Sequence, residues 1–225
     1  MLFDRVPSGY PGADSVFDNI RIGDNVVWQV SNLDEFRLFA RPFAEQAIAD
    51  GRNTVYIHFT RHESLLSAQP GLKIYEFDPD MGFEPFTVAI YDRITTEGPG
   101  TFYVFDCLSE LQSAWYTDQM MGNFFRVTCP YLYELETVAY FPLIRSRHSY
   151  DVIARIRDTT QVLIDVYTSD SSVYIHTLKA QDREGINLYI PHVSQHGGPF
   201  KPLDGGVALS RYYRLLDNIS SHSQY

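Results

Sequence analysis

The fold prediction rests on Asn25-Val26-Val27-Trp28-Gln29-Val30 and the residues directly after it, Ser31-Asn32-Leu33-Asp34-Glu35-Phe36-Arg37-Leu38. The first run is short and apolar, which is typical of a buried strand in a parallel sheet. Asn32, with Glu35 three residues later, predicts an N-cap and a capping box for a helix. The apolar residues that follow keep a helical spacing up to Gly51, namely Leu33, Phe36, Ala40, Phe43 and Ala47. This stretch therefore predicts the first strand and helix of an α/β domain.

Apolar runs and helical patterns alternate along the rest of the chain, as they do in βαβ units. Helices are predicted over 83–96, from Ser109 to Phe125 and after Ser149, and Pro42 is expected to kink or restart the first helix. The order predicts an α/β fold with a mostly parallel central sheet. Its strands are expected at Val26–Val30, Thr54–Phe59, Lys73–Phe77, Thr101–Asp106, Glu136–Phe141 and Val162–Tyr167, followed by an antiparallel strand at Val173–Lys179.

The pattern changes after residue 180. Residues 181–206 hold few apolar runs, and glycine and proline are frequent within 197–206. A short amphipathic helix follows, with Val207, Tyr212, Leu215, Leu216 and Ile219 on one side. We expect residues 1–180 to form one domain and residues 181–225 to form a docking or linker segment.

Composition limits the classes of function. With 225 residues, of which 44% are hydrophobic, the chain can bury a full core. The formal net charge is −10 without a basic cluster, so nucleic acid is not expected as a partner. No apolar run approaches the ~20 residues that span a bilayer, so no membrane association is expected. Two cysteines, Cys107 and Cys129, are too few for a disulfide framework and favour reduced thiols in a cytoplasmic setting.

The turn after the first strand lacks the residues that bind nucleotide phosphates. A phosphate-binding loop needs glycines, whose backbone N–H groups can turn inward, and a lysine ammonium on the terminal phosphates. Residues 31–38 contain neither, and they carry the acidic Asp34 and Glu35. The next glycine is Gly51, and the lysines of the chain are Lys73, Lys179 and Lys201. Residues 31–38 therefore lack the composition of a phosphate-binding loop.

Two motifs resemble those of RecA/KaiC-type P-loop ATPases. Ser8-Gly9-x-Pro11-Gly12-x-Asp14, with Gly23-Asp24 before the first strand, is similar to the lead-in of that family. Phe102-Tyr103-Val104-Phe105-Asp106-Cys107-Leu108-Ser109 resembles its Walker B strand. The resemblance covers about residues 7–180 and implies a RecA-like three-layer sandwich with Walker-B-like positions at Asp106 and Ser109. Asp106 is then a ligand of an ATP/Mg²⁺ site or, without a phosphate loop, a strand-end carboxylate that hydrogen-bonds the next turn.

KaiC-like subunits also reach a neighbour's phosphate with a Lys-x-Arg pair. Leu178-Lys179-Ala180-Gln181 keeps the lysine and has glutamine in place of the arginine, with Arg183 nearby. The resemblance therefore implies a degenerate trans-acting finger of Lys179 and Arg183. Together with the degenerate Walker A loop, this predicts a pseudo-ATPase without catalytic residues and without a cofactor.

A second resemblance covers Gly122-Asn123-Phe124-Phe125-Arg126-Val127-Thr128-Cys129-Pro130-Tyr131 and continues to Arg145-Ser146-Arg147-His148-Ser149. These residues look like the N-terminal region of phosphoenolpyruvate synthase or pyruvate phosphate dikinase-related proteins. The resemblance implies a larger polypeptide in which this domain precedes an ATP-grasp module. Nothing in the chain resembles the ATP-grasp fold or the phosphohistidine segment.

Two further sets of residues are candidate sites. Arg145, Arg147 and His148 follow a predicted strand end, where open α/β sheets bind ligands, so they are either an anion or effector site or solvated loop charges. The helix after the Walker-B-like strand has a broad apolar circumference, which favours contact with a partner subunit. Its candidate interface residues are Trp115, Tyr116, Met120 and Phe124.

Three functions follow from these observations. The first is a non-catalytic RecA/KaiC-like regulatory or interaction domain associated with a phosphoenolpyruvate synthase-like protein. The second is a nucleotide- or phosphometabolite-binding domain with non-standard phosphate contacts from Arg37, Arg41 or Arg145. The third is an oligomerisation scaffold that uses the aromatic helix and the C-terminal helix. The expected partners are a second copy of the chain or a downstream enzyme domain.

Overall fold

The computed structural model describes residues 4–10, 12–59, 63–115, 117–185 and 187–222. A small antiparallel ribbon precedes a nine-stranded sheet. The ribbon consists of β1 (Arg5–Val6) and β2 (Ile20–Arg21). The strands of the sheet are β3 (Asn25–Val30), β4 (Thr54–Phe59), β5 (Leu72–Phe77), β6 (Phe102–Phe105), β7 (Val138–Ile144), β8 (Val162–Ser169), β9 (Ser172–Ala180), β10 (His192–Gln195) and β11 (Lys201–Pro202).

The strand order is β11-β10-β9-β8-β3-β7-β6-β4-β5. All neighbours from β8 to β5 run parallel, and β9, β10 and β11 each pair antiparallel with the strand before them. The predicted α/β fold, with a mostly parallel sheet and an antiparallel extension, is confirmed.

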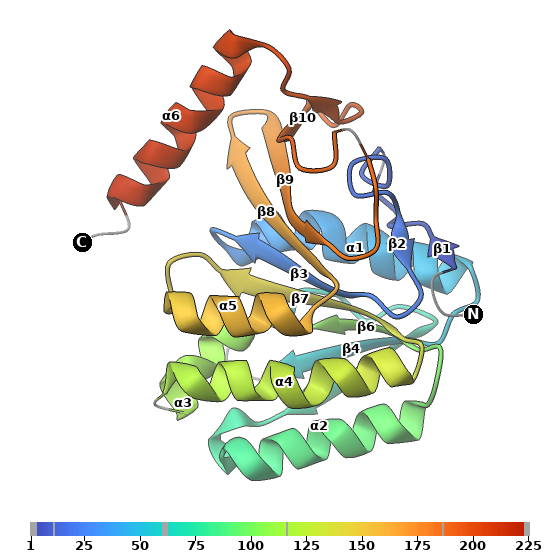
Figure 1. Cartoon of the computed structure of the whole chain (residues 1–225). Coiled ribbons are helices and arrows are strands. Elements are labelled where there is room, and N and C mark those ends of the chain that lie inside the picture. The colour runs from blue at the N-terminus through green and yellow to red at the C-terminus, as the bar shows by residue number, and fades with distance from the viewer. Residues whose placement is uncertain (1–3, 11, 60–62, 116, 186, 223–225) are drawn as a thin grey trace.

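Helices cover both faces of the sheet (Figure 1). One face is covered by α1 (Leu33–Ala49), and the other by α2 (Phe83–Glu97), α4 (Asp118–Glu134) and α5 (Tyr150–Thr159). The short helices are η1 (Pro79–Met81), η2 (Leu108–Leu111) and α3 (Gln112–Trp115). The last helix, α6 (Gly206–His222), lies at the end of the antiparallel extension. Among the helices of the described segments, none is long and apolar enough to cross a membrane.

Alternate residues of the strands fill two separate cores, because successive side chains of a strand point to opposite faces. On the α1 face, Trp28 stacks on Phe39 with ring centroids 4.3 Å apart, and Tyr140 stacks on Phe43 at 3.9 Å. On the other face, Phe105 stacks on Phe141 at 4.4 Å. Much of the high aromatic content therefore lies inside the domain.

Pro42 does not interrupt α1, which is continuous over Leu33–Ala49. The expected restart of the helix is therefore wrong. The carbonyl that loses its hydrogen-bond donor belongs to Leu38, a residue that is 39% exposed. Water can hydrate that carbonyl, so the helix continues.

The strand expected at 136–141 is shifted to Val138–Ile144. Glu136 has a φ of +51° and belongs to the preceding turn. Pro142 lies inside the strand, because its missing N–H faces the side of β6. The pairing of β6 with β7 already ends at Tyr140, so no ladder hydrogen bond is lost there.

Two other expectations are corrected. The helix predicted from Ser109 to Phe125 is divided into η2, α3 and α4, because Thr117 is extended, with φ −140° and ψ 133°. The segment after residue 180 was expected to be loop and helix, and it also contains β10 and β11, with β10 paired to β9. The α6 side chain of Tyr212 is buried against Tyr167, so this helix docks on the domain's own sheet.

Candidate functional site

The turn between β3 and α1 is closed by the chain's own side chains. The Glu35 N–H donates to Asn32 Oδ1 (3.1 Å), which confirms Asn32 as the N-cap. The Glu35 carboxylate accepts the Ser31 N–H on Oε2 (2.6 Å), rather than the Asn32 N–H of a standard capping box. Its other oxygen, Oε1, accepts the Thr168 N–H (3.1 Å) and the Thr168 hydroxyl (2.8 Å).

Glu35 is only 4% exposed, so its carboxylate is an internal anion. Backbone N–H groups at a helix N-terminus after a strand are the usual phosphate-binding groups of nucleotide-binding folds. Here the buried Glu35 carboxylate, beside the N-terminus of α1, accepts the Ser31 N–H and also accepts hydrogen bonds from Thr168 near the end of β8. An added phosphate would meet this negative charge.

The lead-in segment packs along α1. Gly9 has a φ of +75°, and a Cβ at this position would lie 2.1 Å from the carbonyl oxygen of Pro42. The Ser8 N–H donates to Asp14 Oδ1 (2.9 Å). Glycine is therefore required at position 9 by close backbone approach, and the family-like lead-in has a packing role here.

Asp106 lies fully buried at the end of β6. Its Oδ2 accepts the Phe59 N–H at 3.0 Å, and its Oδ1 accepts the Cys107 N–H at 3.0 Å. His58 Nε2 lies 3.6 Å from Oδ2. The carboxylate thus ties the ends of β4 and β6 together, as expected for a strand-end carboxylate that hydrogen-bonds the next turn.

Ser109, the other Walker-B-like residue, belongs to a different cluster. Its Oγ lies 2.8 Å from His148 Nε2 and accepts the Ile144 N–H at 2.9 Å. His148 Nδ1 lies 2.5 Å from Asp118 Oδ1, and Asp118 Oδ2 accepts the Ser149 N–H at 2.7 Å. Burial raises the pKa of Asp118, but hydrogen bonds from Ser149 and His148 outweigh this and lower it. No spacing in the sequence indicated that these residues would meet.

The three residues of the candidate anion site do not converge. The Arg145 guanidinium lies 3.8 Å from the ring centre of Tyr167 and donates to the Val166 carbonyl at 2.8 Å. It also contacts Asp165 at 3.3 Å, and burial raises the pKa of Asp165 against the opposing effect of Arg145. Arg147 instead pairs with Glu110 at 2.9 Å. The Arg145 guanidinium therefore already has its main partners within the chain.

Lys179 and Arg183 also bind within the chain. Arg183 is buried, forms an ion pair with Asp24 and donates to the Asn19 carbonyl at 3.0 and 3.1 Å. Lys179 Nζ donates to the Arg157 carbonyl at 2.5 Å, near the end of α5. Burial lowers the pKa of this lysine. Both side chains hold the antiparallel extension to the rest of the fold.

Two of the four candidate interface residues belong to the core. Trp115 is 6% exposed and Phe124 is fully buried. Both rings pack on Phe86, with centroids 5.3 and 6.5 Å away. Their assignment to an interface is therefore corrected. Met120 is partly buried, and Tyr116 lies outside the described residues.

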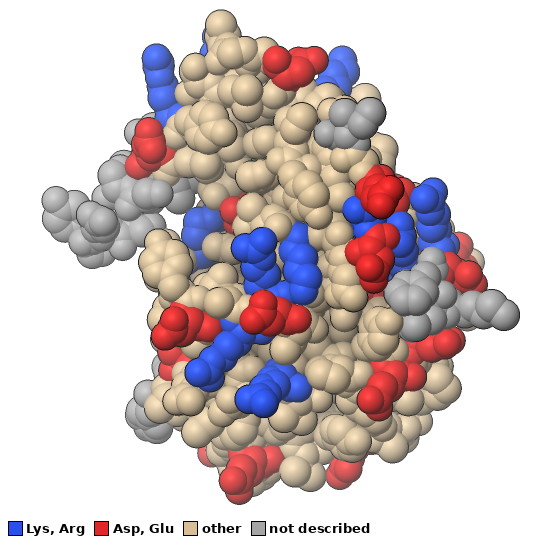
Figure 2. Space-filling view, in the orientation of Figure 1, with Lys and Arg blue, Asp and Glu red and all other residues tan. Residues whose placement is uncertain are grey.

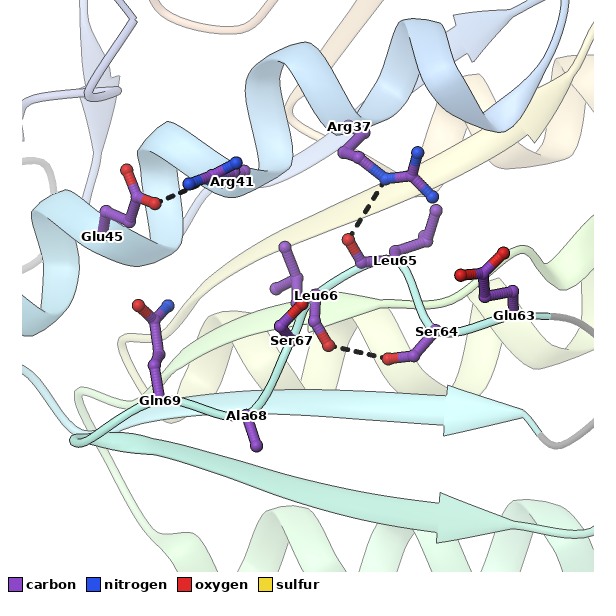
Figure 3. A pocket seen from close by; sticks show the side chains of 10 residues that line it. All are labelled: Arg37, Arg41, Glu45, Glu63, Ser64, Leu65, Leu66, Ser67, Ala68 and Gln69. Atoms are coloured by element: carbon purple, nitrogen blue, oxygen red, sulfur yellow. Dashed lines mark hydrogen bonds and ion pairs between the residues drawn. The ribbon is translucent and has the colours of Figure 1, made fainter.

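A groove of about 310 Å³ lies between α1 and residues 63–69 (Figure 3). Arg37 and Arg41, one helical turn apart, line it from α1. Arg37 Nε donates to the Leu65 carbonyl (3.3 Å), and Arg41 pairs with Glu45 (2.8 Å). Leu65 is buried and its N–H donates to Tyr56 Oη (3.0 Å), so the facing segment is anchored. This groove brings together two of the predicted phosphate-binding arginines, and Glu45 and Glu63 also line it.

Basic and acidic side chains are interspersed on the face of the molecule drawn in Figure 2. Figure 2 shows a group of basic side chains near the middle of the drawn face, with acidic side chains between them. Within the described segments, no three His, Cys, Asp or Glu side chains are grouped so that they could hold a metal ion.

No protein-family model matches the chain, and a search of curated proteins found no similar sequence.

Proposed function

We propose that the chain is a RecA/KaiC-like domain without ATPase activity that acts as a regulatory or interaction module of a phosphoenolpyruvate synthase- or pyruvate phosphate dikinase-like protein. The observation that carries the loss of activity is the Glu35 carboxylate. It is buried beside the N-terminus of α1 and accepts three hydrogen bonds from Ser31 and Thr168. A triphosphate at this turn would have to displace it.

The sheet order supports the RecA-like part of the proposal. One strand, β7, lies between β3 and β6, the strand directly before Asp106. The RecA-like fold has the same arrangement, with one strand between the strand before the phosphate loop and the Walker B strand. Asp106 keeps that position, although its two oxygens accept backbone N–H groups of Phe59 and Cys107. The link to phosphoenolpyruvate synthase-like proteins is supported by the resemblance of residues 122–149.

ATP turnover tests the loss of activity. The purified chain with ATP and Mg²⁺ should release no phosphate above the blank. Asp106→Asn is the informative variant, because it keeps the size of the side chain while removing its charge. Turnover by the wild type that this variant abolishes would overturn the proposal. Turnover that persists in the variant would indicate a contaminating ATPase.

The association is tested with a purified phosphoenolpyruvate synthase-type enzyme. Adding the chain should change the enzyme's sedimentation or its rate of phosphoenolpyruvate formation. If neither changes at tens of micromolar chain, the regulatory part of the proposal fails while the pseudo-ATPase part stands.

A second candidate function, binding of a phosphometabolite, is favoured by the groove between α1 and residues 63–69. Arg37 and Arg41 both line it, and the facing segment, residues 63–69, is anchored by the hydrogen bond from Leu65 to Tyr56. A ligand at 100 times its dissociation constant adds about 2.7 kcal/mol of stability. Thermal shift against nucleotides and phosphoenolpyruvate should then show stabilisation that Arg37→Gln and Arg41→Gln remove. Arg126→Gln, at an exposed position on α4, is the matched control.

The absence of a shift with every compound in the panel would rule this candidate out at those concentrations. The features that suggested an oligomerisation scaffold have their partners inside the chain. Trp115 and Phe124 of the aromatic helix are core residues, and α6 docks on its own sheet.

A further inference from the structure

Ser109, His148 and Asp118 form a continuous chain of hydrogen bonds between η2, the loop after β7 and the first turn of α4. Ser109 Oγ lies 2.8 Å from His148 Nε2, and His148 Nδ1 lies 2.5 Å from Asp118 Oδ1. This is the connectivity of a nucleophile, a general base and an orienting carboxylate. From this geometry we infer that Ser109 is a nucleophilic serine that activated acyl donors can modify. The inference needs neither nucleotide nor partner, so it is independent of the proposed function.

For a neutral imidazole, the two hydrogen-bond partners of His148 assign the ring proton to one nitrogen. An ionised carboxylate only accepts, so Nδ1 of His148 donates to Asp118. Nε2 is then the acceptor in the neutral ring, and the Ser109 hydroxyl must donate to it. A lone pair of Ser109 Oγ remains for the Ile144 N–H, which lies 2.9 Å away. Every group in the chain is satisfied, with the serine proton directed at the base.

The carboxylate is itself fixed. Asp118 Oδ2 accepts the N–H of Ser149, the residue after His148, at 2.7 Å. The carboxylate that orients the imidazole is therefore held in place by the backbone next to it. The His148 side chain is fully buried. Such packing keeps the base in one rotamer, which is the condition for efficient proton transfer to it.

Access to Ser109 requires a local opening, because this residue is only 1% exposed. Glu110 follows Ser109, Arg147 precedes His148, and these two form an ion pair at 2.9 Å. Their side chains are 34% and 49% exposed. Breaking an exposed ion pair of this kind costs little stability. Opening must also displace part of η2, in which Leu108 and Leu111 are fully buried.

The class of substrate follows from the backbone around Ser109. The Glu110 N–H, the next donor along the chain, already donates to the Cys107 carbonyl at 3.1 Å. It is therefore not directed at a developing oxyanion, and loss of one such donor typically costs 10²–10³ in rate. The reagent that modifies Ser109 must then carry a good leaving group, as an aryl ester does in acyl transfer and a fluorophosphonate does in phosphonyl transfer.

The reaction with an aryl ester is balanced within these groups. Ser109 Oγ forms a bond to the carbonyl carbon while its proton moves to His148 Nε2. The bond from that carbon to the aryl oxygen breaks, and the phenolate takes the proton from His148. The product is an acyl-Ser109 and a phenol. With a fluorophosphonate, the O–P bond forms, the P–F bond breaks, and fluoride leaves with the proton.

The test is covalent labelling of the folded full chain with a fluorophosphonate, followed by intact mass and peptide mapping. One adduct is expected, on Ser109, and Ser109→Ala should remove it. His148→Gln should slow labelling at least about 100-fold, the lower end of what a general base contributes. Ser194→Ala is the matched control, because Ser194 is also buried but donates to the Gly198 carbonyl. It should label like the wild type.

Two results would overturn the inference: no adduct on Ser109 in the folded chain, or labelling that is as fast in His148→Gln as in the wild type. Should that variant not fold, the pH dependence of wild-type labelling decides. Protonated imidazole cannot accept the serine proton, so the labelling rate must fall at the pH at which His148 becomes protonated. A rate that stays constant at every pH at which the chain remains folded would equally exclude His148 as the base.

Discussion

Replacing Glu35 with alanine is the sharpest perturbation of the turn after β3. The change leaves three donors without their acceptor, namely the Ser31 N–H, the Thr168 N–H and the Thr168 hydroxyl. Each lost hydrogen bond to the carboxylate costs about 1–3 kcal/mol, with the lower value favoured here because Ser31 is exposed and Thr168 is half-buried. The favourable charge in the first turn of α1 adds about 0.5 kcal/mol. Water can enter the vacated space, so we expect the lower end, a loss of about 3–4 kcal/mol. Glu35→Gln should cost about 1–2 kcal/mol, because its amide oxygen can keep the Thr168 bonds.

Urea denaturation followed by circular dichroism measures this loss. The midpoint should fall in Glu35→Ala while the slope of free energy against urea stays the same. Glu45→Ala is the matched control on the same helix, since Glu45 forms an exposed pair with Arg41. Its free energy of unfolding should change by less than about 0.5 kcal/mol.

Anion rescue then tests whether the carboxylate stands where an anion would bind. Formate or inorganic phosphate should stabilise Glu35→Ala more than the wild type, because only the variant has the donors vacant. At ten times its dissociation constant, such an anion adds about 1.4 kcal/mol. A variant as stable as the wild type, or equal stabilisation of both by phosphate, would refute the reasoning.

Three further predictions concern other parts of the fold. Burial raises the pKa of Glu97, but hydrogen bonds from Lys73 and two other side chains outweigh it and lower that pKa to about 2. Because the folded-state pKa lies below the unfolded one, this stabilisation is complete above about pH 4.5 and is lost as the pH falls toward 2. The free energy of unfolding, measured by urea titration at each pH, should therefore change less over this range in Glu97→Gln than in the wild type. Burial raises the pKa of Cys107 to about 12 and also raises that of Cys129, so iodoacetamide at pH 8 should modify neither thiol until the chain is unfolded, and mass spectrometry would detect a native adduct. Tyr212→Ala removes the buried anchor of α6 at a cost of about 3 kcal/mol in docking, so limited proteolysis should cleave before α6 faster than in the wild type; equal cleavage rates would contradict this role.

Strands of the parallel sheet that are continuous apolar runs were predictable from the sequence. Thr54–Phe59 has the predicted bounds, and every residue in it is buried. The end of β7 was not predictable from local rules. Proline in a strand argues against a central position, and only the early end of the β6 pairing makes Pro142 acceptable. The strands β10 and β11 have four and two residues, too few to show an alternating pattern.

The candidate sites show the same limit. The capping role of Asn32 depends on neighbours in sequence, and it was predicted. Glu35 also binds Thr168, 133 residues away, which depends on β8 lying beside β3. The contact between Ser109 and His148 likewise depends on β6 and β7 being neighbours. Side-chain clusters built across strands require the sheet order, which sequence patterns do not supply.

The two edges of the sheet differ in a way that bears on assembly. At one edge, β11 has two residues and ends in Pro202, so it offers little backbone to pair with. At the other, β5 has six residues and, among the described residues, pairs only with β4. Charged Lys73 and Glu76 on β5 hinder indiscriminate pairing. A strand added to this sheet is therefore expected beside β5 rather than beside β11, and two copies joined through β5 would form a closed pair rather than a growing array.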